Sequence, residues 1–159
     1  MNIAVFASGT GSNFAAIASA VSCNQIPAKL TLLVCDNPRA KVIGKARKAG
    51  VEVFLIERGA FARRQDFEKA IIAKLKQAGI ELVVLAGFMR ILSPEFVRDF
   101  KNRVINIHPS LLPAFKGSHG IKDAFDYGVK LTGVTVHFVD ERMDHGPIIM
   151  QEAVPVREK

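Results

Sequence analysis

The sequence contains only two cysteines and no long hydrophobic run, and both absences narrow the possible classes of protein. Cys23 and Cys35 have neither a CxxC spacing nor the density of a disulfide framework, so we expect buried, reduced thiols in a cytoplasmic protein. Apolar runs such as Leu82–Ala86 are far too short to span a bilayer. Residues 1–6 show no basic stretch followed by a small-residue cleavage site, so they predict a first strand rather than a signal peptide.

Nucleic-acid-binding motifs are also missing, although the 159-residue chain carries a net charge of +7. Residues 1–80 hold 12 lysines and arginines against five acidic residues, whereas residues 81–159 are balanced. The basic residues are scattered and are not interleaved with aromatic residues. The positive electrostatic potential of the first half would attract a small anionic ligand. The same distribution of charge would also result from basic residues on solvated helix faces.

What the sequence does contain is a repeated switch between strand-like and helix-like hydrophobic periods. Strands are predicted over 2–7, 29–36, 51–56, 82–86 and 103–107, and helices over 13–21, 41–49, 64–78, from Ser93-Pro94 onward, and 121–127. Two further strands over 132–139 and 147–156 are interpreted as antiparallel edge additions. The alternation predicts a single α/β domain over 1–159, with a Rossmann-like, open, mostly parallel twisted sheet and helices on both faces.

A glycine-rich loop, GTGSN at residues 9–13, joins the first predicted strand to the first predicted helix. Ligands bind at this edge of an open α/β sheet, and a helix N-terminus there attracts phosphate; Ser12 and Asn13 add side-chain donors. A P-loop would need a lysine that is absent. A dinucleotide fingerprint would need a glycine in place of Phe14, although Asp36 ends the next strand where a ribose-binding acid would lie. Phosphate binding, dinucleotide binding and a plain Ser/Asn-capped turn are the three interpretations.

Asn106 and His108 give the most specific signal. They lie two residues apart on a predicted strand, so their side chains project from one face, opposite Ile105 and Ile107. Burying two polar side chains at the end of a strand costs free energy unless they are hydrogen-bonded or take part in the function. Asparagine can donate to a developing oxyanion, and histidine can exchange a proton near neutral pH. The alternative interpretation is a hydrogen-bonded pair in the core.

Asp144 is the acid that could complete this set, in the segment VDERMDHGP at residues 139–147. Its alternative interpretation is an ordinary solvated acidic turn. No metal site is expected, because the close ligand spacings of zinc sites are absent among the four histidines, His108, His119, His137 and His145.

Four segments occur in order along the chain: ASGTGSN at 7–13, AGFMRIL at 86–92, NIHPSLLP at 106–113 and DHGPI at 144–148. With them the whole chain resembles the folate-dependent formyltransferases, and among these the phosphoribosylglycinamide formyltransferases. Methionyl-tRNA formyltransferases and formyltetrahydrofolate deformylases share the Asn-x-His and Asp set. The glycine-rich loop, and the lack of an added regulatory or tRNA-binding domain, separate this chain from them.

The resemblance implies a role for each matching residue. The expected catalytic residues are Asn106, His108 and Asp144. The ribonucleotide phosphate would be held by Gly11, Ser12 and Asn13. The folate pocket would be lined by Arg64, Met89, Arg90, Ile91, Leu92, Val97, Asp140 and Glu141. Thr135 and His137 would support the site from behind.

The implied reaction transfers a formyl group from 10-formyltetrahydrofolate, without a metal, to the amine of 5'-phosphoribosylglycinamide in de novo purine biosynthesis. The expected partners are these small molecules, not nucleic acid or a membrane, and the protein would be a monomer or homodimer. Family members continue into a further helix with ribonucleotide contacts, which a sequence ending at Lys159 does not contain. The rival functions are a hydrolase that uses the same residues with water, and a non-catalytic dinucleotide-binding module.

Overall fold

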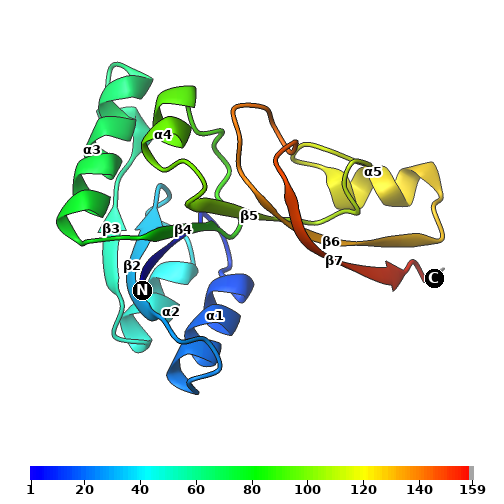
Figure 1. Ribbon diagram of the computed structural model, residues 1–159, viewed down its shortest axis with the longest axis horizontal. Coiled ribbons are helices and arrows are strands. Elements are labelled where there is room, and N and C mark those ends of the chain that lie inside the picture. Colours follow the sequence, from blue (N-terminus) through cyan, green and yellow to red (C-terminus); the bar gives the residue numbers. More distant parts are fainter. Residues whose placement is uncertain (158–159) are drawn as a thin grey trace.

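A seven-stranded sheet runs through the protein in the order β3-β2-β1-β4-β5-β6-β7 (Figure 1). The computed structural model describes residues 1–157. The strands are β1 (Asn2–Phe6), β2 (Lys29–Cys35), β3 (Glu52–Leu55), β4 (Leu82–Leu85), β5 (Val104–His108), β6 (Leu131–Phe138) and β7 (Ile148–Pro155). β1 to β5 pair in parallel, and β6 and β7 are added antiparallel. The predicted mostly parallel α/β sheet with antiparallel edge strands is confirmed.

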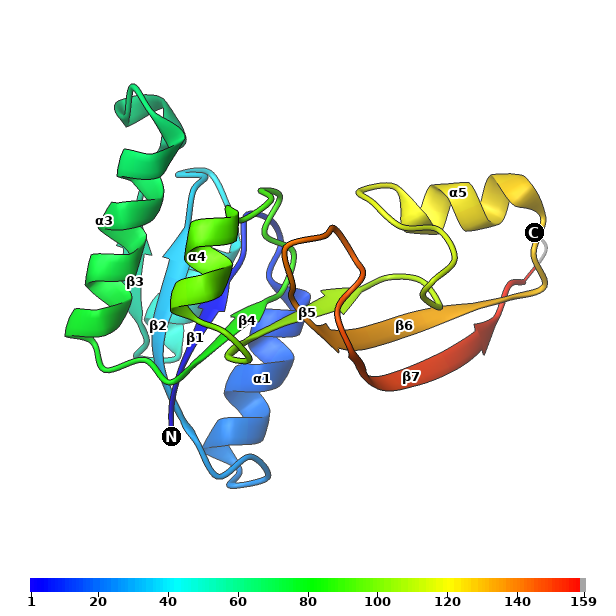
Figure 2. The same cartoon turned by 45° about the horizontal axis from the view of Figure 1, so that its top comes forward.

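Helices cover both faces of the parallel part of the sheet (Figure 2). They are α1 (Ser12–Ser22), α2 (Val42–Lys48), the short 3₁₀ helix η1 (Arg58–Ala60), α3 (Arg64–Gln77), α4 (Pro94–Asp99) and α5 (Gly120–Tyr127). Because side chains alternate across a strand, Ala4 and Phe6 join the core under α3 and α4, whereas Ile3 and Val5 join the core over α1 and α2. This two-sided burial is why the central strands read as continuous apolar runs.

Local signals in the sequence account for several helix boundaries. Ser93 caps α4 by accepting a hydrogen bond from the Phe96 amide at 3.2 Å, and Pro94 occupies the first turn. Gly50 and Gly79 follow α2 and α3 with φ angles of 68° and 61°, the left-handed conformation that ends helices. The predicted boundaries in these places are confirmed to within two residues.

β6, β7 and α5 form an arm that extends away from the other helices (Figures 1 and 2). Every residue of β7 is exposed, because this strand is the free edge of the sheet and no helix covers it. The loop between β6 and β7 places Asp144 next to His108 at the carboxyl end of β5, so the arm brings residues far apart in sequence to this site. Within residues 1–157, no helix is long and apolar enough to cross a membrane.

The two cysteines differ in their environment. Both are free, but only Cys35 is buried, at the end of β2; Cys23 is exposed. The prediction that both thiols are buried is therefore wrong for Cys23. It follows α1 directly, at a helix end where the chain turns back toward β2 and no second layer covers it.

We expect iodoacetamide at pH 8 to alkylate native protein at Cys23 alone. Burial raises the pKa of the Cys35 thiol, and the neighbouring Asp36 charge adds to this effect, so Cys35 holds less of the reactive thiolate at that pH and is also sheltered. Intact-mass spectrometry should show one adduct on the native protein and two in denaturant. Rapid modification of Cys35 in the native state would contradict this prediction.

Candidate functional site

A cavity of about 510 Å³ opens at the carboxyl ends of β1, β4 and β5. Its lining unites residues from the loop after β1, the segment after β4, the end of β5 and the loop between β6 and β7. Of the predicted site residues, those that line it are Asn13, Met89, Arg90, Ile91, Leu92, Asn106, His108, His137, Asp140, Glu141 and Asp144. Residues as far apart in the chain as Asn13 and Asp144, which are 131 positions apart, thus meet around one space.

Asn106 is held in a defined orientation by His137 on the neighbouring strand β6, its direct partner in the sheet register. His137 Nδ1 lies 2.8 Å from the Phe138 carbonyl oxygen, which can only accept, so Nδ1 carries the proton. Nε2 is then the acceptor for the Asn106 amide group, Nδ2, at 3.2 Å. Since the amide nitrogen is fixed by this bond, its second N–H is available as a donor in the cavity.

His108 lies at the end of β5 with its ring 4% exposed. Its Nε2 is 2.9 Å from the Phe115 carbonyl oxygen and therefore donates, which leaves Nδ1 as the nitrogen that can gain a proton. Nδ1 faces Asp144 Oδ2 at 3.6 Å. This separation exceeds a direct hydrogen bond, so the carboxylate acts on the ring through its charge, in a poorly solvated place.

Asp144 reaches the histidines from the loop between β6 and β7. Its backbone is left-handed, with φ 49°, and its Oδ2 accepts a hydrogen bond from the Gly117 amide at 2.8 Å. Its Oδ1 lies 3.8 Å from His137 Nε2. One carboxylate therefore lies between two buried imidazoles and ties this loop to the segment that precedes α5.

The predicted phosphate loop has the expected place but not the expected cap. α1 begins at Ser12 with Gly11 as the N-cap residue, in the left-handed conformation and without a side-chain capping bond. The interpretation as a Ser/Asn-capped turn is therefore wrong, because Ser12 and Asn13 are already helical and both are exposed. Lys45 of α2 donates to the Gly11 carbonyl at 3.3 Å and adds positive charge beside the loop. Phe14, at the position of a third fingerprint glycine, is buried in the core.

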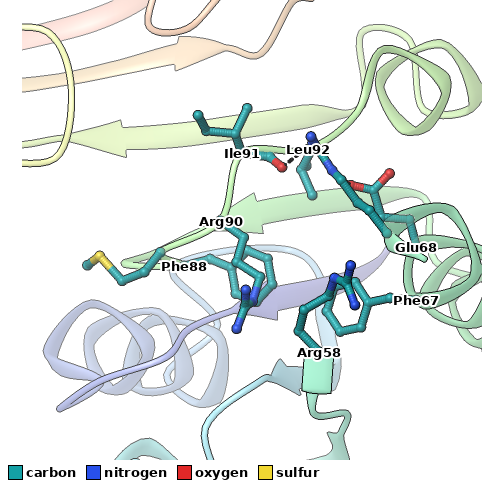
Figure 3. Close-up of a pocket in the computed structure, with 9 residues that line it drawn as sticks. Arg58, Phe67, Glu68, Phe88, Arg90, Ile91 and Leu92 are labelled. Atoms are coloured by element: carbon teal, nitrogen blue, oxygen red, sulfur yellow. Dashed lines mark hydrogen bonds and ion pairs between the residues drawn. The ribbon is translucent and has the colours of Figure 1, made fainter. Parts of the chain in front are cut away.

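A second, smaller cavity of about 290 Å³ adjoins the first behind the segment after β4, and residues 88–92 line both (Figure 3). Arg58, Arg64 and Arg90 surround it over an apolar floor that includes Phe67. Arg64, predicted for the folate pocket, lies here rather than in the larger cavity. The combination of three guanidinium groups and aromatic surface suits an anionic or flat, conjugated group.

Five predicted residues do not line the larger cavity: Gly11, Ser12 and Arg64, which are described above, and Val97 and Thr135. Val97 is 7% exposed and packs in the core under α4, so a contact with bound folate stays a prediction. Thr135 is fully buried on β6. Its hydroxyl donates to the Ser110 carbonyl at 2.7 Å and accepts from the Leu112 amide at 3.1 Å, which fastens the turn after His108 to the sheet.

The sequence interpretation missed Gly117 and Ser118 in the lining and Phe115 as the partner of His108. No regular element holds residues 109–119, and nothing in their spacing indicates that the chain folds back over the end of β5. The glycine at position 120 is the one sequence feature that agrees with this close packing. A Cβ at Gly120 would lie 2.9 Å from the Phe115 carbonyl oxygen and 3.4 Å from His108 Nε2. Within residues 1–157, no group of three or more His, Cys, Asp or Glu side chains could hold a metal ion.

The sequence and the fold of this chain are similar to those of known formyltransferases. The family model described as "Formyl transferase" matches residues 1–159. Phosphoribosylglycinamide formyltransferase of Bacillus subtilis is 46% identical over 155 residues, which are 98% of this chain and 80% of that protein. The trifunctional purine biosynthetic protein adenosine-3 of Homo sapiens is 43% identical, but this chain spans only 15% of its length. A crystal structure of phosphoribosylglycinamide formyltransferase from Bacillus halodurans superposes with a TM-score of 0.97 at 42% identity, over 100% of this chain and 82% of that one.

Proposed function

This chain belongs to the formyl transferase family, and on that premise we propose that it transfers the formyl group of 10-formyltetrahydrofolate to the amine of 5'-phosphoribosylglycinamide in purine biosynthesis. One observation carries the assignment. Asn106, His108 and Asp144 line a single cavity together with Asn13 of the phosphate-type loop and the segment 88–92. Two substrates can therefore reach the same reactive residues.

The chemistry proceeds by direct transfer. The amine nitrogen of the ribonucleotide attacks the formyl carbon, and the former carbonyl oxygen gains negative charge in a tetrahedral intermediate. The bond from that carbon to the folate nitrogen then breaks; the attacking amine loses a proton and the leaving nitrogen gains one. No covalent intermediate with the protein is needed, and the reacting residues include no serine or cysteine nucleophile.

Asn106 and His108 stabilise the oxyanion. The free N–H of the Asn106 amide donates to it, an effect on the order of 10²–10³ in rate for one such donor. The His108 ring lies beside the same site, and the Asp144 carboxylate, 3.6 Å from its Nδ1, stabilises positive charge on the ring as the oxyanion forms. Both residues belong to β5 and are held by other residues, so little reorganisation accompanies the reaction.

The two substrates take different borders of the cavity. Asn13, at the start of α1, meets the phosphate of the ribonucleotide together with the free amides and dipole of the helix N-terminus, with Lys45 adding charge nearby. The segment 88–92 and the loop with Asp140 and Glu141 hold the folate. We further propose that the protein works in the cytoplasm as a monomer or homodimer, which light scattering on the purified protein distinguishes.

The direct test is an assay of formyl transfer with both substrates present and with the ribonucleotide left out. Formylated ribonucleotide should form only in the complete mixture, and little formate should be released without the amine. Rapid formate release in the absence of the amine would identify a hydrolase instead. Binding of NAD in a titration, without transfer, would favour the dinucleotide-binding interpretation.

Replacing Asn13 by alanine should raise KM for the ribonucleotide about tenfold or more, since a hydrogen bond to a charged group contributes about 1.5–3 kcal/mol. KM for the folate, measured in the same assay, should stay within about twofold because Asn13 belongs to the loop assigned to the phosphate and not to the folate-binding segment. Steady-state kinetics with each substrate varied in turn measures both values. Equal increases for the two substrates would contradict the phosphate assignment.

A further inference from the structure

Asp36 directly follows β2, and its buried carboxylate is not used by the proposed chemistry. Its side chain is only 5% exposed, and a carboxylate so poorly solvated needs partners. The sequence suggests a ribose-binding acid at this place. In the structure, however, both carboxylate oxygens are already engaged by the protein itself, by Ser8 and by Arg90.

These two partners belong to the two borders of the cavity. Ser8 ends the stretch after β1 that leads into the phosphate-type loop, and its hydroxyl donates to Asp36 Oδ1 at 2.5 Å. Arg90 belongs to the segment after β4, and its Nε donates to Asp36 Oδ2. The Arg90 guanidinium is also placed over the Phe67 ring, 5.8 Å from its centre. One carboxylate thus joins two segments that are 82 residues apart.

Further contacts close this junction. The Met89 amide donates to the Ser8 hydroxyl at 3.4 Å, and the Ser8 amide donates to the Gly87 carbonyl at 3.0 Å. Asn37, the residue after Asp36, donates from its side chain to the Ser8 carbonyl at 3.1 Å. Ser8 is therefore held on three sides, and a displacement of either segment changes the position of the other.

We propose that Asp36 is a positioning residue that couples the ribonucleotide-binding loop at 9–13 to the folate-binding segment at 87–92. The proposal rests on the proposed function for the identity of the two ligands. Asp36 touches neither substrate. It acts through Ser8 and Arg90, so that one carboxylate fixes the positions of both the ribonucleotide-binding loop and the folate-binding segment.

Glu68 of α3 supplies a matched control, because it is a second buried acid under the same folate-binding segment. Its Oε1 accepts from Arg64 Nε and from the Ser93 amide, each at 3.0 Å. Arg64 in turn donates to the Ile91 carbonyl. These bonds hold the far end of the segment and reach no residue of the loop after β1, so Glu68 supports one border only.

Hydrogen exchange on the ligand-free protein tests the coupling without any assumption about substrates. Asp36→Asn should speed amide exchange about tenfold in both 8–13 and 87–92, because the lost ion-pair bond frees Arg90 and weakens the hold on Ser8. Glu68→Gln should speed exchange at the far end of the segment, in 91–93, and leave 8–13 unchanged. Faster exchange in only one segment for Asp36→Asn would overturn the proposal.

Kinetics give a second readout that a purely structural role would not produce. Asp36→Asn should raise KM for both substrates about tenfold, whereas Glu68→Gln should raise KM for the folate alone. If Asp36→Asn changes only the folate KM, the coupling is absent. Absence of formyl transfer by the wild-type protein would refute the proposed function and leave the exchange result to decide the coupling.

Ser8→Ala keeps the test decisive if Asp36→Asn does not fold. This change removes one hydroxyl and leaves the Asp36–Arg90 ion pair in place, and thermal unfolding reports whether the variant is native. It should speed exchange in both 8–13 and 87–92, by less than Asp36→Asn. An unchanged exchange rate in 87–92 would overturn the proposal, since the hydroxyl is the link between Asp36 and the loop after β1.

Discussion

Replacing Asp144 by asparagine is expected to lower kcat on the order of 10²–10³-fold, because the carboxylate charge beside His108 is lost from the site that stabilises the oxyanion. The substitution keeps the shape of the side chain, and asparagine tolerates the left-handed backbone at this position, φ 49°. It can also still accept the bond from the Gly117 amide. What it removes is the negative charge 3.6 Å from His108 Nδ1.

The loss should appear in kcat and much less in substrate affinity, because the protonated His108 is most valuable when the oxyanion forms. Steady-state kinetics measures kcat, and calorimetric titration measures folate affinity. Asp126→Asn is a suitable control: it removes an acid of α5 that pairs with Lys122 on the surface, so kcat should stay within about twofold. A nearly unchanged kcat in Asp144→Asn would assign Asp144 only to holding its loop.

Replacing Gly11 by alanine is expected to destabilise the protein by about 2–5 kcal/mol, through two separate causes. The backbone at Gly11 has φ 70°, which costs an L-residue about 1–2 kcal/mol. In addition, a Cβ would lie 2.4 Å from Val42 Cγ2 and 3.0 Å from the Val42 Cα. Val42 is fully buried at the start of α2, so it has no room to retreat, and overpacking adds about 1–3 kcal/mol.

Gly50→Ala separates these causes, since Gly50 has a similar φ of 68° but open space where the Cβ would lie. It should cost about 1–2 kcal/mol, the strain alone. Urea unfolding of both variants measures the free energies. Gly11→Ala should also weaken ribonucleotide binding, because the displaced loop carries Asn13. An equal loss of stability in the two variants would show that the contact with Val42 is not restrictive.

The sequence alone determined the order and type of the regular elements. Hydrophobic period separates strands buried on both faces from helices, and Ser93, Pro94, Gly50 and Gly79 mark boundaries by local backbone preferences that act within a few residues. It also determined that Asn106 and His108 share one face of a strand, since the period of two is a property of any strand. The resemblance of four motifs added the family and a role for Asp144.

The tertiary structure alone decided which of these residues meet. The position of Asp144 between His108 and His137 and the exposure of Cys23 depend on how elements distant in sequence pack. The carbonyl that selects the protonated nitrogen of His108 comes from Phe115, in a loop whose return over β5 has no local signal. The same holds for Asp36. Its position after β2 is compatible with ribose binding, but in the structure Ser8 and Arg90 already donate to its two carboxylate oxygens. Hydrophobic period and capping act between near neighbours, whereas hydrogen bonding and burial at a site depend on how the chain returns through space, for which one sequence has no local signal.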